Sequence, residues 1–414
     1  MPIKGIDLSE NKEITMSRYV AILYSMLLLS GTLQAQQSEL FSGGDPVFHR
    51  EKCIIPFELR GHKIYLPVKL QGSGKVYRFI LDTGAFSSIA EEVAEEMGLT
   101  RGSSLDAGSE IKRAYLLKEK ISIRTGDVEL EDFRIISMDY SYFYQTDPEM
   151  DGFLGSDFLK YFYVVIDYRQ RELTLSRYPV SPAVSSQQYR LKLQTDNAAS
   201  LPKLQCRVND SWQWIGLIDT GAPFTIVFPL SLINKKDWRN IPLIESIGVM
   251  ASWPTSPIQK NYLTRIESLQ IGELELHDIP VIFSNTEDII LGQELLSQFL
   301  IYLNYPDDEL ILLPAGKIFI KSNYYSTGLN VNKTADNRTV IEAIWQGSAA
   351  DKAGLSLNTD IIKINSQPTD RLSLNDINRL LNDDRISTIE LVIKEGYRDR
   401  TVLLKKAFLL PETN

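Results

Sequence analysis

The sequence predicts a mostly β protein in which one unit occurs twice and a smaller α+β module follows. Three blocks of sequence recur with the same offset of 137 positions: Asp82-Thr-Gly-Ala with Asp219-Thr-Gly-Ala, Asp151 in DGFLGSD with Asp288 in DIILGQE, and Tyr168 with Tyr305. Repetition in a single register indicates a duplicated structural unit. We therefore expect one copy over residues 46–180, a second over 186–316 and the module over 319–408.

Each copy is expected to consist of short strands. The candidate strands are rich in β-branched and aromatic residues and are separated by Gly, Asn and Asp. In the first copy they are residues 64–70, 76–81, 120–124, 128–136 and 162–168. A helix is expected from Ser87 to Met97, because several Glu residues form an exposed face and Gly98 follows as a C-terminal stop. A helical turn is expected over 158–162.

The composition argues against several classes of protein. The chain has 44 Lys and Arg against 53 Asp and Glu, a formal charge of −9, and no long basic run, so a nucleic-acid partner is not expected. With two Cys and three His in scattered positions, we expect no metal site. No GxSxG and no phosphate-binding loop occur, and no cofactor is expected. Any chemistry should therefore be carried out by carboxylates.

The N-terminus has the layout of a secretory signal peptide. Arg18 precedes a mostly apolar run over 19–29, and small residues lead to a candidate cleavage site after Ala35. Residues 1–35 are therefore predicted to be an export signal, with Met16 as an alternative start and an apolar core helix as the alternative interpretation. The run is too short to span a membrane, so no integral membrane span is expected. We predict a periplasmic or extracellular protein.

Export would permit a disulfide between Cys53 and Cys206. Two unpaired buried cysteines are the alternative, because the geometry that a disulfide requires cannot be read from sequence.

The two Asp-Thr-Gly segments each follow an apolar strand, and together they suggest a site with paired carboxylates. Two carboxyls held about 3 Å apart cannot both ionise, so they share a proton and titrate as a pair. The ionised member can act as general base on a water, while the protonated member donates to the carbonyl oxygen under attack. Glycine after Thr allows the tight turn that such a pairing needs.

The duplicated unit resembles the aspartic peptidases, specifically the retroviral-type lobe fused in tandem as in a single-chain pepsin. The pattern of apolar-apolar-Asp-Thr-Gly-Ala followed by apolar-apolar-Gly occurs twice, the second part as 153–155 and 290–292. The resemblance implies two β-barrel lobes related by a pseudo-twofold axis, with Asp82 and Asp219 as the catalytic pair. It also implies that Thr83 and Thr220 lock the loops together by hydrogen bonds and that Gly84 and Gly221 orient the carboxylates. A peptide or protein is the implied substrate, and a monomer is expected.

The walls of the cleft are less clearly marked. The resemblance implies a hairpin after each Asp-Thr-Gly, and the candidates are 105–114, with its tip near Gly108, and 247–257, which contains Trp253. Trp253 is a candidate pocket wall, with core packing as the alternative. Residues 139–147 are rich in aromatics, of which Tyr142 and Tyr144 are candidates for a cleft wall, with an ordinary surface loop as the alternative.

The residue after Asp-Thr-Gly is Ala85 in the first copy and Ala222 in the second. Pepsin-like proteins usually carry Ser or Thr there. Since no hydroxyl can stabilise the carboxylate, we predict a mildly acidic to near-neutral pH optimum.

The C-terminal module resembles a PDZ domain in the bacterial strand order. The matching segments are 347–355 (GSAADKAGL) and 360–365 (DIIKIN). The resemblance implies that Gly328 and Leu329 offer backbone N–H groups to the C-terminal carboxylate of a peptide. The peptide would lie along Asn330 and Val331 and against a helix at 374–381. Packing or a dimer surface is the alternative use of this module.

These observations together predict an exported aspartic endopeptidase with a PDZ domain. The alternative is a catalytically silent peptide-binding scaffold that uses the same cleft and groove. Lobes that pair between chains, as in viral dimers, are disfavoured by the in-register duplication.

Overall fold

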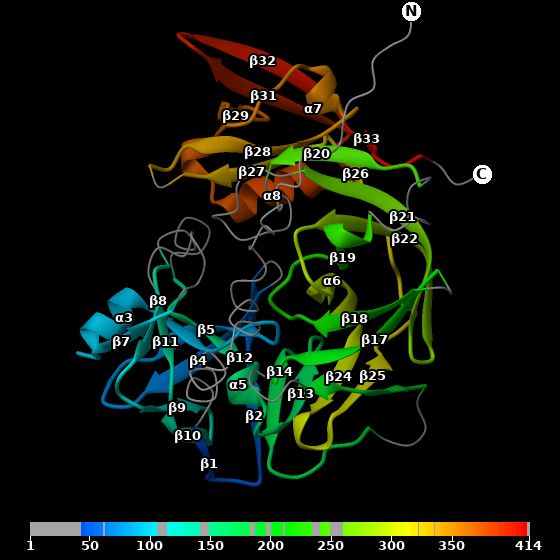
Figure 1. Cartoon of the computed structure of the whole chain (residues 1–414). Helices are drawn as coiled ribbons and strands as arrows, with labels where there is room; N and C mark the ends of the chain where they lie inside the picture. Colours follow the sequence, from blue (N-terminus) through cyan, green and yellow to red (C-terminus); the bar gives the residue numbers. More distant parts are fainter. Residues whose placement is uncertain are drawn as a thin grey trace, which may run out of the picture.

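The computed structural model describes residues 43–411 except 61–62, 106–113, 141–148, 183–186, 196–199, 210–211, 234–240, 249–259, 322 and 335. The described residues form three large sheets and one two-stranded ribbon (Figure 1). The prediction of a mostly β fold is confirmed. The α-helices are short: α3 (Glu91–Glu96), α5 (Ser156–Leu159), α6 (Gln293–Leu296), α7 (Ala349–Lys352) and α8 (Leu374–Asn382).

The first copy contributes an 11-stranded sheet. Its order is β1-β10-β9-β4-β5-β12-β6-β11-β8-β7, with β3 beside β4. The strands are β1 (Asp45–Phe48), β3 (Glu58–Arg60), β4 (Lys63–Leu70), β5 (Tyr77–Asp82), β6 (Ser88–Ala90), β7 (Arg101–Ser104), β8 (Ala114–Leu117), β9 (Ile121–Thr125), β10 (Val128–Phe133), β11 (Ile136–Met138) and β12 (Gly152–Gly155). At its centre β5 runs parallel to β12, which places Asp82 opposite Gly155.

The helix that we expected from Ser87 to Met97 begins only at Glu91, so the first part of that prediction is wrong. Residues 88–90 instead form β6, which pairs parallel with β11 and antiparallel with β12. These three residues are at most 2% exposed, so burial in the sheet outweighs their local preference for helix. The turn expected over 158–162 is α5, which begins two residues earlier.

The second copy repeats the central pairing of the first within a 14-stranded sheet. Strand β18 (Trp212–Ile218) runs parallel to β23 (Ile289–Leu291), β23 is antiparallel to β19 (Ile226–Pro229), and β19 is parallel to β22 (Leu274–Ser284). These pairings correspond to β5–β12, β12–β6 and β6–β11. The other strands of this copy in the sheet are β16 (Gln194–Thr195), β17 (Pro202–Val208), β20 (Ile244–Gly248) and β21 (Lys260–Ile271). A 3₁₀ turn, η2 (Leu230–Leu232), follows β19.

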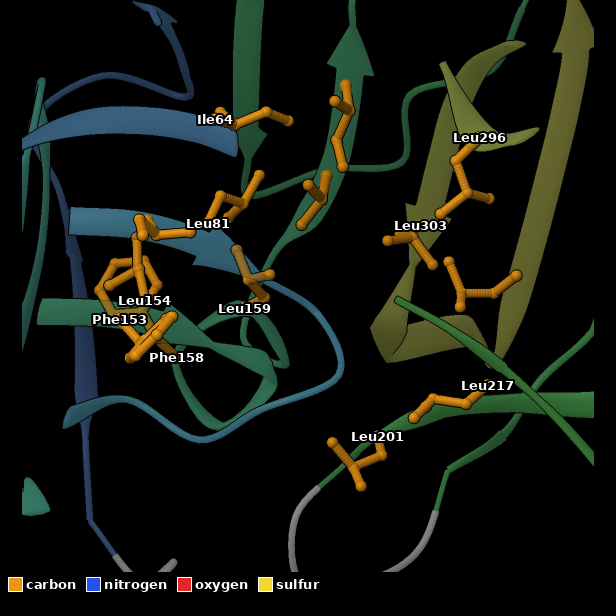
Figure 2. Packing of buried hydrophobic residues seen from close by; sticks show 14 of the residues in the cluster. Ile64, Leu81, Phe153, Leu154, Phe158, Leu159, Leu201, Leu217, Leu296 and Leu303 are labelled. Carbon is orange, nitrogen blue, oxygen red and sulfur yellow. The ribbon is translucent and has the colours of Figure 1, made fainter. Parts of the chain in front are cut away.

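A six-stranded sheet joins the two copies. Its order is β15-β25-β24-β13-β14-β2. The strands are β2 (Lys52–Pro56), β13 (Tyr163–Asp167), β14 (Glu172–Ser176), β15 (Tyr189–Lys192), β24 (Phe299–Asn304) and β25 (Glu309–Pro314), with the 3₁₀ turn η4 (Tyr305–Asp307) between the last two. Strands β13 and β24 pair antiparallel, with Val165 opposite Tyr302. One buried apolar cluster contains residues of both copies, among them Leu81 and Leu303 (Figure 2). The copies thus share a sheet and a core.

The C-terminal residues form a module with an apolar core of its own. Its elements besides α7 and α8 are β26 (Tyr325–Ser326), β27 (Leu329–Lys333), β28 (Thr339–Trp345), β29 (Asp360–Ile364), β30 (Gln367–Pro368), η5 (Thr369–Arg371), β31 (Thr388–Glu395), β32 (Arg398–Lys405) and β33 (Ala407–Phe408). Ile341, Ile377 and Ile389 are fully buried in this core. Helix α8 lies where the sequence predicts it and begins with a capping box at Ser373.

The 14-stranded sheet continues from the second copy into this module, because β20 pairs with β28 (Figure 1).

Both cysteines are free and buried, which is the second of the two alternatives. The Sγ of Cys53 accepts a hydrogen bond from the N–H of Asp127 at 3.1 Å. Burial raises the pKa of the Cys206 thiol to about 12, so this thiol stays protonated and unreactive near neutral pH. In the described part of the chain, no helix has the length and apolar character to cross a bilayer.

Candidate active site

The two Asp-Thr-Gly segments meet where the copies face each other. Asp82 is the last residue of β5, and Asp219 follows β18 directly. Each segment is held by the apolar-apolar-Gly strand of its own copy: Gly155 lies opposite Asp82, and the N–H of Asp219 donates to the carbonyl of Leu291 at 3.1 Å. The strand pairing therefore fixes both aspartates at equivalent positions.

The threonines bind each other's loops reciprocally. The N–H of Thr83 donates to Thr220 Oγ1 at 3.1 Å, and the N–H of Thr220 donates to Thr83 Oγ1 at 3.0 Å. Each hydroxyl in turn donates to a carbonyl of the other copy, Thr83 to Ile218 at 2.6 Å and Thr220 to Leu81 at 3.0 Å. Both threonines are fully buried, so these four bonds replace contacts with water that the groups have lost.

The glycines allow the carboxyls to approach. A Cβ on Gly84 would lie 2.5 Å from Cγ of Asp219, and a Cβ on Gly221 would overlap the carboxyl of Asp82. Each carboxyl therefore lies against the glycine of the opposite loop, and any larger residue there would separate the pair.

The hydrogen bonds to the two carboxyls differ. Oδ1 of Asp219 accepts from the N–H groups of Gly221 and Ala222, both at 2.9 Å. Oδ1 of Asp82 accepts from the N–H of Gly84 at 2.9 Å, whereas the N–H of Ala85 donates to the backbone carbonyl of Asp82. Among the described backbone groups, Asp219 thus has two donors to its carboxyl and Asp82 has one.

The surroundings raise the pKa of both carboxyls. Burial raises the pKa of Asp82 well above its usual value, and the charge of Asp219 raises it further. Burial also raises the pKa of Asp219, but the N–H donors of Ala222 and Gly221 and a hydrogen bond from Asp82 oppose that rise. The additional N–H donor stabilises the charged form of Asp219 more than that of Asp82.

An acidic residue behind each loop, buried in the first copy and partly buried in the second, was not identified from the sequence. In the first copy, Asp157 accepts from the N–H and Oγ of Ser87, both at 2.8 Å. In the second copy, Glu294 accepts from Thr225 Oγ1 at 2.5 Å. Asp157 and Glu294 occupy the same position of the repeat, two residues after Leu-Gly (294 − 157 = 137). An acidic residue repeated at one position was the signal that could have indicated this role.

A second contact links the copies below the loops. Ser156 Oγ donates to the carbonyl of Thr83 at 2.7 Å and lies 3.0 Å from Tyr305 Oη. Since the serine hydrogen is used on Thr83, the Tyr305 hydroxyl donates to Ser156. Tyr305 comes from the second copy, so it supports the Asp-Thr-Gly loop of the first.

The candidate cleft walls Gly108, Trp253, Tyr142 and Tyr144 lie outside the described residues. Tyr140, from the same aromatic segment, is fully buried; its hydroxyl is 2.6 Å from Ser88 Oγ and its ring contacts Phe153 edge-on. Tyr140 therefore packs inside the first copy.

Of the four candidate peptide-binding residues of the module, Gly328 directly precedes β27 and the other three begin that strand, with α8 in contact with it. The N–H of Gly328 donates to Ser326 Oγ at 3.0 Å, and the side chain of Asn330 donates to Glu342 at 3.1 Å. Leu329 pairs with Ile344 of β28, and Val331 is buried in the module's core. Within the described strands, β27 pairs only with β28, and peptide binding at its other edge stays a prediction.

Comparisons with known proteins add partial matches. Residues 66–158, which include Asp82, match a protein family described as "Aspartyl protease". The search of curated proteins found no match. A solved PDZ domain protein from Parabacteroides distasonis is 26% identical over 21% of this chain and 21% of that chain, with a TM-score of 0.20. This chain therefore spans about a fifth of the length of that protein.

Proposed function

We propose that the protein is an aspartic endopeptidase in which Asp82 and Asp219 activate a water for attack on a peptide bond. The observation that carries the proposal is the pair of carboxyls held face to face by the reciprocal bonds of Thr83 and Thr220. The family match over residues 66–158 supports the same class of activity.

The unequal hydrogen bonding suggests a role for each carboxyl. Asp219, with two backbone donors, is the carboxylate that takes a proton from the attacking water. Asp82, with one backbone donor and a pKa raised by burial and by the charge of Asp219, holds the shared proton and donates it to the carbonyl oxygen of the scissile bond. When the C–N bond breaks, the proton taken by Asp219 passes to the leaving nitrogen, and one hydroxyl of the tetrahedral intermediate returns a proton to Asp82.

One chain supplies both carboxyls in this proposal, so the active unit is a monomer, and sedimentation at assay concentration would test that state. The N-terminal run that resembles a signal peptide supports export. The module's β27 edge is proposed to bind the C-terminus of a substrate or partner peptide at residues 328–331.

The experiment is cleavage of a mixed peptide library by the full chain across about pH 2 to 8, read by mass spectrometry. We expect cleavage with a mildly acidic to near-neutral optimum, because Ala85 and Ala222 offer no hydroxyl to the carboxylates. Asp82→Asn and Asp219→Asn should each lower the rate by about 10²–10⁴-fold while the fold is kept. A statine-type inhibitor should block the wild-type protein.

Asp399→Asn provides the matched control, because Asp399 is exposed on β32 and the change is chemically the same. It should leave the rate unchanged. A folded wild-type chain that cleaves no peptide at any of these pH values would refute the peptidase and favour the silent peptide-binding scaffold. A cleaving protein whose optimum lies below about pH 3 would refute the account of the two alanines.

A further inference from the structure

The C-terminal module is built into the second copy by backbone hydrogen bonds. Strands β20 and β28 pair antiparallel, with Ser246 opposite Trp345 and Gly248 opposite Ala343. One more bond extends the pairing, from the N–H of Gln346 to the carbonyl of Glu245 at 2.8 Å. The module therefore continues the sheet of the second copy.

The sequence at this junction is adapted to close contact. Gly248 has φ +112°, and a Cβ on it would overlap the carbonyl oxygen of Glu342 on β28. The carbonyl of Gly248 accepts from Nδ2 of Asn261 at 2.8 Å, and Asn261 Oδ1 accepts from Ser284 Oγ at 2.9 Å. Asn261 is fully buried, so its bonds fix the end of β20 against β21 and β22.

Side chains of the module complete an apolar cluster in the second copy. Trp345 and Leu410 of the C-terminal residues pack with Leu263 of β21 and Ile282 of β22, and all four are at most 4% exposed. Phe224 packs against this cluster and also against the main core. Phe224 lies five residues after Asp219, in the loop that follows Asp-Thr-Gly.

The equivalent position of the first copy is anchored differently. It is Ser87, five residues after Asp82, and it is held by hydrogen bonds to the buried Asp157. In the second copy an aromatic ring, Phe224, replaces the serine and packs against the cluster that contains Trp345, while the equivalent carboxylate, Glu294, binds the next residue, Thr225. The residue five positions after the aspartate is thus held by polar contacts in the first copy and by apolar contacts in the second.

The anchored loop carries a donor to the candidate active site. Two residues before Phe224, the N–H of Ala222 donates to Oδ1 of Asp219, and the carbonyl of Ala222 accepts from the N–H of Gln293 at 2.8 Å. A shift of Phe224 would turn this peptide and lengthen the bond to Asp219. It is the second of two backbone donors to that carboxyl, and the one that has no counterpart on Asp82.

We propose that Trp345 is a positioning residue for the carboxyl pair, because its cluster holds Phe224 and so keeps the N–H of Ala222 on Asp219. The inference rests on the proposed function. It assigns to the C-terminal module a part in forming the site itself, besides any binding of peptide at β27.

The test is a pH titration of the carboxyl pair. It is monitored by NMR on the full chain, labelled with ¹³C at the Asp carboxyl carbons. Asp82→Asn and Asp219→Asn assign the two resonances. Among the described residues, two other groups interact electrostatically with the pair. The charge of Lys63 on β4 lowers the pKa of Asp82, and the charge of Asp219 raises the pKa of Tyr168, which follows β13. Neither is altered by the variants below.

Trp345→Ala should raise the lower apparent pKa of the pair by about 0.5–1 unit, because a donor to the charged form is weakened. Trp345→Phe should restore most of the wild-type value. Leu410→Ala, which trims the same cluster from its other side, should shift the pKa in the same direction and serves if Trp345→Ala fails to fold. Ile393→Ala is the control, since Ile393 is buried in the module's own core, and it should leave the titration unchanged.

Folded Trp345→Ala and Leu410→Ala proteins with the wild-type titration would overturn the proposal. An equal shift in Ile393→Ala would also overturn it, because loss of module stability alone would then explain the effect. The titration needs no turnover, so a chain that cleaves no peptide would refute the proposed function and still give a result for Trp345.

Discussion

Removing the hydroxyl of Thr83 should loosen the contact between the two copies. In Thr83→Val the shape of the side chain is kept, but the N–H of Thr220 and the carbonyl of Ile218 each lose a partner in a fully buried place. A buried group left without its hydrogen bond costs about 1–3 kcal/mol, and two groups lose their partner here. We therefore expect a loss of about 2–4 kcal/mol of unfolding free energy.

The assay is denaturant unfolding together with hydrogen exchange at the amide of Thr220. That amide should exchange about 30- to 1,000-fold faster in Thr83→Val, which is the same free energy expressed as a rate ratio. Thr83→Ser keeps the hydroxyl and loses one methyl, so it should cost about 1 kcal/mol. Thr388→Val, at an exposed position of β31, should change stability by less than about 0.5 kcal/mol. A Thr83→Val protein as stable as the Thr388→Val control would refute the reasoning.

Three further predictions concern other parts of the chain. Gly221→Ala should abolish peptide cleavage in a folded protein, because the new methyl meets a carboxyl of the pair, whereas Gly74→Ala, with open space around it, should keep the wild-type rate. Asp157→Ala should cost about 3 kcal/mol in thermal unfolding, since it leaves the buried N–H and hydroxyl of Ser87 without an acceptor; Asp157→Asn should cost less. Burial raises the pKa of Glu342 to about 7 from 4.5. The folded protein therefore holds that proton between these values while the unfolded chain releases it, so stability should fall by up to about 3 kcal/mol as pH rises from 4.5 to 7. Glu342→Gln should flatten that part of the curve of melting temperature against pH, and an unchanged curve would contradict the assignment.

Internal repetition made the pairing of Asp82 with Asp219 predictable. Residues at the same position of two copies of one unit occupy equivalent places in the fold, and the apolar strand before each aspartate fixed where it would lie. The mostly β fold and α8 were predictable for a related reason, since strand composition and the capping sequence at Ser373 are local signals.

Anchors that depend on distant contacts were not predictable. Phe224 stands where the first copy has Ser87, so the spacing of the repeat could not show what holds it. Trp345 lies in a module that the sequence marks as separate, and only the β20–β28 pairing brings it to the second copy. The helix expected from Ser87 failed for the same reason, because strand pairing with β11 and β12 decides the conformation of residues 88–90.

The central claim is that the two facing carboxyls form one catalytic unit. Its most direct test is the ratio of cleavage rates between the wild-type chain and Asp219→Asn, on a peptide that the wild-type chain cleaves and at the pH of its maximum. A ratio of about 10² or more, with both proteins folded, is the predicted result. A ratio close to one would contradict the account, because cleavage would then proceed without the carboxylate on which it depends.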